Sequence, residues 1–183
     1  KADKQHCFEK FFIPGLGDDL ETRADFTDDQ IRLIRNMPPS NTLEIDCMIH
    51  LMLDTGLRVK ECCGLLVKDV DLKAETPHLV LYKNNIRGLK NKNSRRIVPL
   101  VGASLTALLK LTEAELSTFL FPRYVIETEN EVKNGSASAA CNKRLEALLG
   151  QSCPTSHCFR HTMQTRLRNA ECPKDKRNEI SGW

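Results

Sequence analysis

The sequence lacks several features that would assign it to a familiar class of protein. No apolar run approaches the length of a membrane-spanning helix, and no signal-peptide pattern opens the chain. The eight cysteines include no Cys-x-x-Cys pair, so the usual pattern of a structural zinc site is missing. No internal repeat is visible, and the net charge is only +3. These absences argue against a membrane-spanning, zinc-stabilised, repetitive or strongly polybasic protein.

The composition that remains is that of a globular domain. Hydrophobic residues make up 40% and charged residues 28% of the 183 residues, which argues against a mainly disordered chain and suffices for one well-packed domain. The cysteines are spread along the sequence, and several lie within apolar helical patterns, which favours reduced and mostly buried thiols. We therefore expect a cytoplasmic protein without a membrane partner.

Charge is distributed unevenly along the chain. Residues 83–96 include six basic side chains and no acidic one, and residues 143–177 are similarly basic, whereas the first third carries acidic runs. Such segregation favours one basic face toward a polyanion, with nucleic acid as the leading candidate. Solvated basic loops are the alternative interpretation.

Capping and stop signals predict most of the helices. Thr27 is suited to cap a helix that Pro38 and Pro39 end, a second helix should end at Gly56, and a third should cover 59–66. Further helices are predicted at 102–111, 135–149, 157–170 and 174–181.

The hydrophobic period changes after the third predicted helix. Three short, partly β-branched runs follow, KDVDLK, PHLVLYK and SRRIVPL, each with alternating character and separated by polar turns. We predict a three-stranded antiparallel sheet in which residues 84–93 connect the second and third strands. The expected fold class is mainly α with one small antiparallel sheet (α+β).

Three separate segments concentrate residues suited to bind a phosphate. Arg58 lies in DTGLRVKE at a tight turn between two helices, with Glu61 on the same helix face. GLKNKNSRR is a basic connection, and HCFRH places His157 and Arg160 within one helical turn. Arginine contacts phosphate oxygens in a bidentate manner, and lysine or histidine can protonate a leaving oxygen. On residue chemistry alone, HCFRH could be a catalytic cluster, a metal site or a solvated helix face.

Four segments resemble, in order and spacing, the catalytic domain of tyrosine recombinases (the phage-integrase family). They are TGLRVKECCGLLVKDVDL, LKNKNSRRIVPL, HCFRHTMQTRL and ISGW. The resemblance implies a catalytic domain over residues 26–183, truncated at its C-terminal end. Residues 1–25 are then expected to be a linker or the tail of a missing N-terminal DNA-binding domain.

The resemblance implies that Arg58, His157 and Arg160 hold the scissile phosphate and that Glu61 supports Arg58. In this family a tyrosine attacks the phosphate and forms a 3′-phosphotyrosyl link, which is covalent nucleophilic catalysis. The bond energy is conserved in that link, so no cofactor, metal or ATP is implied.

Other matching positions imply the remaining chemistry. Lys90, or Lys92 as the alternative, would protonate the departing 5′ hydroxyl, and Trp183 would stand where many relatives have histidine. The nucleophile of the family lies shortly beyond Trp183, and neither Tyr82 nor Tyr124 is at that position. The sequence as given is therefore expected to bind DNA without cleaving it.

The partners implied are double-stranded DNA and further protomers, as a homotetramer on DNA, in the DNA recombination or integration of phages and other mobile elements. Side chains expected to contact DNA are Arg87, Lys92, Arg95, Lys143 and Arg144.

Two other functions are consistent with the residues. One is a non-catalytic DNA-binding protein that retains the recombinase fold, and the other is a metal-dependent hydrolase built on His157, His161 and the cysteines. No glutamate adjoins His157 and no third ligand is evident, which disfavours the hydrolase. We predict that His161 is a supporting residue in a tight core rather than a catalytic one.

Overall fold

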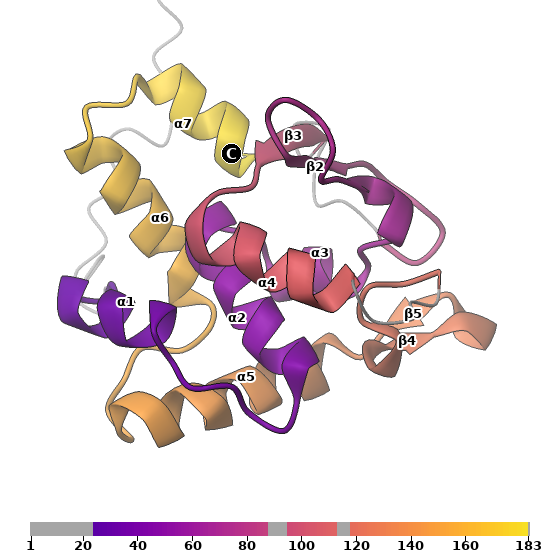
Figure 1. The fold of residues 1–183 in the computed structure, drawn as a ribbon, viewed down its shortest axis with the longest axis horizontal. Helices are drawn as coiled ribbons and strands as arrows, with labels where there is room; N and C mark the ends of the chain where they lie inside the picture. The colour runs from indigo at the N-terminus through magenta and orange to yellow at the C-terminus, as the bar shows by residue number, and fades with distance from the viewer. Residues whose placement is uncertain (1–23, 88–94, 113–117, 183) are drawn as a thin grey trace, which may run out of the picture.

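The computed structural model describes residues 24–87, 95–112 and 118–182 and is mainly helical (Figure 1). The helices are α1 (Asp28–Arg35), α2 (Leu43–Thr55), α3 (Val59–Cys63), α4 (Gly102–Thr112), α5 (Asn134–Leu149), α6 (Cys158–Asn169) and α7 (Lys174–Ser181). The strands are β1 (Val70–Asp71), β2 (His78–Leu81), β3 (Arg96–Pro99), β4 (Val125–Ile126) and β5 (Glu131–Val132). The predicted fold class, mainly α with a small antiparallel sheet, is confirmed.

Helix α2 lies at the centre of the core, and α4, α5 and α6 pack around it (Figure 1). Its residues from Ile45 to Thr55 are buried with the exception of His50, so the helix is enclosed by the protein on nearly all sides. Phe159 of α6 is completely buried and stacks on Phe26, with ring centroids 4.5 Å apart and an interplanar angle of 15°. This contact fixes the start of α6 against the core, directly beside Arg160.

The ends of two helices follow the predicted signals. Thr27 and Gln30 form a capping box at the start of α1, in which each backbone N–H donates to the other residue's side chain. Gly56 ends α2 in the left-handed conformation, with φ of 65°, and its N–H donates to the Met52 carbonyl. This glycine reverses the chain within one turn and leads it directly to Arg58.

The main sheet has the order β1-β2-β3, and both pairs of neighbours are antiparallel. Leu79 of β2 pairs with Val98 of β3, and both side chains are buried. Burial alternates along β3, because Arg96 and Val98 face inward while Ile97 is exposed. Arg96 is therefore on the core face of the sheet.

Two details differ from the sequence-based expectation. Helix α3 ends at Cys63 rather than Leu66, because Gly64 caps it and Leu66 instead forms a bridge with Phe119. The antiparallel pair β4–β5 was not predicted, since strands of two residues are too short to show an alternating pattern.

None of the described helices is long and apolar enough to cross a membrane. Seven cysteines lie within the described ranges as free thiols, and five of them are buried.

Candidate functional site

The turn between α2 and α3 positions the first predicted site residue. Arg58 immediately precedes α3, and its backbone N–H donates to Glu61 Oε2 at 3.0 Å. Its guanidinium Nη1 donates to Glu61 Oε1 at 2.8 Å, while 31% of the side chain stays exposed. One carboxylate thus fixes both the main chain and the side chain of Arg58, as the expected supporting role of Glu61 requires.

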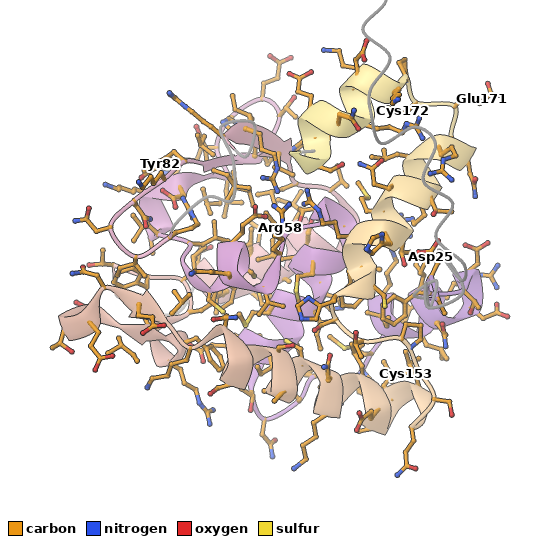
Figure 2. All side chains as sticks on the ribbon, turned by 180° about the vertical axis from the view of Figure 1, so that it is seen from behind. Asp25, Arg58, Tyr82, Cys153, Glu171 and Cys172 are labelled. Carbon is orange, nitrogen blue, oxygen red and sulfur yellow. The ribbon has the colours of Figure 1, made fainter. Side chains whose placement is uncertain are left out.

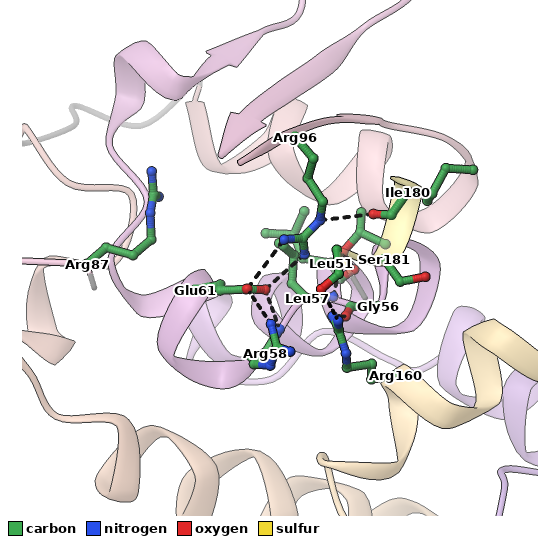
Figure 3. A network of polar contacts seen from close by, with 12 residues as sticks. Leu51, Gly56, Leu57, Arg58, Glu61, Arg87, Arg96, Arg160, Ile180 and Ser181 are labelled. Atoms are coloured by element: carbon green, nitrogen blue, oxygen red, sulfur yellow. Dashed lines mark hydrogen bonds and ion pairs between the residues drawn. The ribbon is translucent and has the colours of Figure 1, made fainter. Parts of the chain in front are cut away.

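A second guanidinium, from β3, meets the same carboxylate (Figure 3). Arg96 Nη2 donates to Glu61 Oε2 at 2.9 Å and Nη1 to Oε1 at 3.4 Å, in a fork-like arrangement. Its Nε donates to the Ile180 carbonyl at 2.9 Å. The sequence placed Arg96 in a basic run and in the third predicted strand, but it assigned Arg96 no part in the site. The strand alternation with Val98 was the signal that could have placed it inside.

The third guanidinium comes from α6. Arg160 is buried, and it donates from Nη1 to the Gly56 carbonyl at 3.1 Å and from Nη2 to the Gly182 carbonyl at 3.2 Å. Figure 3 shows Arg160 beside Gly56, on the same side of α3 as Arg58 and Glu61. The structure therefore brings Arg160 close to Arg58 and Glu61, from which it is separated by 102 and 99 positions in the sequence.

The electrostatics of this cluster are dominated by positive charge. Burial and the nearby Arg58 charge lower the pKa of Arg160 to about 10, which still leaves it protonated at neutral pH. Burial alone would raise the pKa of Glu61, but hydrogen bonding and charge from Arg96 and Arg58 lower it below the ordinary value. One ionised carboxylate thus faces three guanidinium groups, an arrangement that favours binding of an additional anion.

The two histidines of HCFRH both lie at the surface at the start of α6. His157 occupies the residue before the helix and is exposed, so its ring is accessible to a ligand. His161 is also exposed, which corrects the expectation that it lies in a tight core; the inward positions of this turn are taken by Phe159 and Thr162. No group of three or more His, Cys, Asp or Glu side chains is placed to hold a metal ion within the described part of the chain.

Three of the predicted site residues lie outside the described residues. They are the two lysine candidates, Lys90 and Lys92, and Trp183. Their predicted roles therefore stay predictions.

The described residues that were expected to contact DNA differ in exposure. Arg95 and Lys143 are exposed, as a DNA-contacting role requires. Arg144 is half-buried, and its Nε pairs with Asp46 Oδ1 at 2.9 Å, so part of its guanidinium is engaged within the fold.

Arg87 is completely buried, which corrects the expectation that it contacts DNA. Its Nη1 pairs with Asp69 Oδ2 at 3.0 Å and also donates to the Gly64 carbonyl at 3.1 Å. A Cβ at Gly64 would lie 2.9 Å from the Arg87 Cβ, so only glycine leaves room for this packing. The guanidinium also lies 5.5 Å from the ring centroid of Tyr82. These contacts hold the Arg87 guanidinium inside the fold, against Gly64, Asp69 and Tyr82.

Neither tyrosine takes part in the hydrogen bonds described above for Arg58, Glu61 and Arg160. Tyr124 is buried, and Tyr82 directly follows β2 at the edge of the view in Figure 2, whereas Arg58 lies near the middle. The Asp69 carboxylate is the main cause that raises the pKa of Tyr82. A raised pKa keeps the phenol protonated, which is the opposite of its activation as a nucleophile.

Comparisons with known proteins agree with this geometry. Residues 25–183 match the model of the phage integrase family. Tyrosine recombinase XerC of Roseiflexus castenholzii (strain DSM 13941 / HLO8) is 25% identical over 162 residues, covering 78% of this chain and 45% of that relative.

Solved structures share the fold. The Tn1549 transposon integrase in complex with transposon right end DNA is 21% identical with a TM-score of 0.64, covering 90% of this chain and 59% of that one. XerA recombinase is 20% identical with a TM-score of 0.66, covering 87% of this chain and 54% of that one. The chain thus spans about half the length of these relatives. Since the family model covers most of the sequence and the recombinase fold is present, this chain belongs to the phage integrase family.

Proposed function

We propose that this chain is the phosphate-binding part of the catalytic domain of a site-specific DNA recombinase or integrase. The observation that carries the proposal is the convergence of Arg58 and Arg160 on one positively charged cluster around the buried Glu61. These arginines come from two of the segments that carry the family resemblance. Because they lie close together, both segments can contribute to binding one phosphate.

In the proposed reaction, Arg58, Arg160 and His157 bind the scissile phosphate of duplex DNA. Guanidinium groups offer pairs of N–H donors that fit phosphate oxygens and offset the negative charge that builds up on them in the transition state. Glu61 limits the freedom of Arg58, because it accepts hydrogen bonds from both its backbone and its side chain. His157 is exposed at the start of α6, which suits a contact with substrate.

The strand-exchange step requires a nucleophile and an acid. A tyrosine from the full-length protein attacks the phosphorus, so that a tyrosyl oxygen–phosphorus bond forms while the bond from phosphorus to the 5′ oxygen breaks. The tyrosine loses its proton, and Lys90, with Lys92 as the alternative, gives a proton to the departing 5′ oxygen. Trp183 would donate its indole N–H beside the phosphate. Rejoining reverses these bond changes, with no metal or ATP.

The proposed partners are double-stranded DNA and further protomers of the same protein in a tetramer on paired sites. Exposed Arg95 and Lys143 supply positive charge for phosphate contacts outside the cleavage site. The structure of the Tn1549 integrase, which has the same fold, contains transposon right end DNA. This supports the proposal that the present chain also binds DNA.

The test uses the full-length protein and a nicked duplex on which a cleaved strand cannot be rejoined. We expect a covalent protein–DNA adduct that resists denaturing gel electrophoresis, and noncovalent binding that weakens steeply with salt as counterions are released. Salt-sensitive binding with no adduct would instead identify a non-catalytic DNA-binding protein. Binding that does not respond to salt would contradict both functions.

A further inference from the structure

Arg96 connects three elements that the sequence motifs treat separately (Figure 3). It starts from β3, reaches Glu61 of α3 with two N–H groups, and reaches the Ile180 carbonyl of α7 with a third. Only 2% of its side chain is exposed. A buried guanidinium is costly unless it is fully paired, so this placement requires that all these partners keep fixed positions.

The end of α7 is built to receive this arginine. Gly182 has φ of 67°, and a Cβ there would lie 2.8 Å from Arg96 Nη1, so only glycine allows so close an approach. Helix α7 has no basic residue in its own last turn. The positive charge that favours a helix C-terminus comes instead from Arg96 on the Ile180 carbonyl and from Arg160 on the Gly182 carbonyl.

The same side chain determines the position of Arg58 indirectly. Glu61 accepts from Arg96 on one side and from the backbone and guanidinium of Arg58 on the other. The carboxylate is 4% exposed, so it is held mainly by these arginines rather than by water. A displacement of Arg96 would therefore move or free Glu61, and Arg58 would lose its fixed orientation.

We propose that Arg96 is a positioning residue of the phosphate site, which fixes Arg58 through Glu61 and the end of α7 through Ile180. The inference rests on the proposed recombinase function and adds a residue that does not itself touch DNA. Reacting groups that are misplaced by about 1 Å can lose roughly 100-fold in rate. Loss of Arg96 should therefore slow covalent strand cleavage much more than it weakens DNA binding, whose phosphate contacts are spread over the surface.

The test compares Arg96→Gln with Arg32→Gln in the full-length protein. Arg32 is an exposed arginine of α1 that pairs with the exposed Asp29. Neither residue belongs to a segment of the proposed site. The Arg32→Gln variant therefore controls for the loss of one positive charge. We expect Arg96→Gln to slow adduct formation on the nicked duplex roughly 100-fold while the dissociation constant for that duplex changes less than about threefold. Arg32→Gln should change neither.

The dependence of the adduct rate on pH separates positioning from a general loss of structure. The charged groups that face Glu61 are Arg58 at the residue before α3, Arg96 of β3 and Arg160 of α6. Burial raises the pKa of Glu61, and the charge and hydrogen bonds of Arg96 and Arg58 lower it. Without Arg96 the pKa of Glu61 therefore rises, and the carboxylate becomes protonated at a higher pH. The acid side of the rate profile should therefore move to higher pH in Arg96→Gln, whereas a general structural defect would lower the rate equally at all pH values.

Each outcome bears on a distinct claim. Adducts in the unaltered protein together with equal rates and profiles for Arg96→Gln and Arg32→Gln would overturn the positioning role and leave the recombinase function intact. Absence of adducts in the unaltered protein would overturn both. Should circular dichroism show that Arg96→Gln is unfolded, Arg96→Lys keeps the charge, but one ammonium cannot pair with both Glu61 oxygens and also reach Ile180. Its adduct rate should fall at least about tenfold, and an unchanged rate would refute the inference.

Discussion

Replacement of Glu61 by glutamine removes the carboxylate that organises the arginine cluster, and it should destabilise the fold strongly. The ion pairs are short, 2.8 Å to Arg58 and 2.9 Å to Arg96, and the Glu61 and Arg96 side chains are nearly inaccessible to water. Removing one partner of a buried ion pair costs about 3–5 kcal/mol, because the remaining charge stays buried without compensation. Glutamine keeps one oxygen acceptor, but its amide N–H group then faces an arginine N–H donor. We therefore expect the free energy of unfolding to fall by an amount within that range.

The assay is equilibrium unfolding in urea, with Glu179→Gln as the matched control. Glu179 pairs with Lys176 at 2.9 Å, but both side chains are about two-thirds exposed, so its loss should cost less than about 1 kcal/mol. With a slope of about 2 kcal/mol/M, the Glu61→Gln midpoint should fall by about 2 M and the control midpoint by less than about 0.5 M. Equal midpoints for the two variants would refute the reasoning about burial.

Two further predictions concern the same region. Because the folded pKa of Glu61 lies below the ordinary value of 4.5, its stabilising contribution is complete above that value and is lost as the pH falls through the folded pKa. The unaltered protein should therefore lose more stability between pH 6 and acid pH than Glu61→Gln, and parallel losses in urea unfolding would contradict this sign. Phe159→Ala should cost about 3–5 kcal/mol of unfolding free energy, since it removes a buried ring stacked on Phe26; a loss below about 1 kcal/mol would contradict the assigned core position.

Local signals were sufficient to predict most of the secondary structure. Helix α1 begins after Thr27 and α2 ends at Gly56, because a capping side chain and a left-handed glycine act within a few residues of the chain. The three strands of the main sheet were predicted from alternation, β-branched residues and the polar turns between the runs. The pair β4–β5 was not, because its strands depend on pairing rather than on a local pattern.

The fate of individual arginines could not be predicted from composition. Arg95, Arg96 and Arg87 belong to one basic run, yet Arg95 is exposed while the other two are buried. Burial depends on Glu61 and Asp69, carboxylates that lie 35 and 18 positions away in the sequence. Strand alternation could have placed Arg96 inside, but no short-range signal identifies Asp69 as the partner of Arg87.

The exposure of His161 also could not be predicted from the sequence. It adjoins Arg160, and we expected it inside a tight core, but the turn of α6 directs Phe159 and Arg160 inward and leaves His161 exposed. The side of α6 that faces the core is determined by its packing against α2. The apolar residues of α6 occupy only part of each turn, so the sequence alone indicates that side only weakly.

The central claim, that Arg58 and Arg160 form a site for the scissile phosphate, is tested most directly by Arg160→Ala in the full-length protein. Adduct formation on a nicked duplex should fall at least about 100-fold, since a transition-state donor is lost, while Arg32→Ala retains the unaltered rate. Circular dichroism and duplex binding should show that the Arg160→Ala protein is folded and still reaches DNA. A folded Arg160→Ala variant that forms adducts at the unaltered rate would contradict the account.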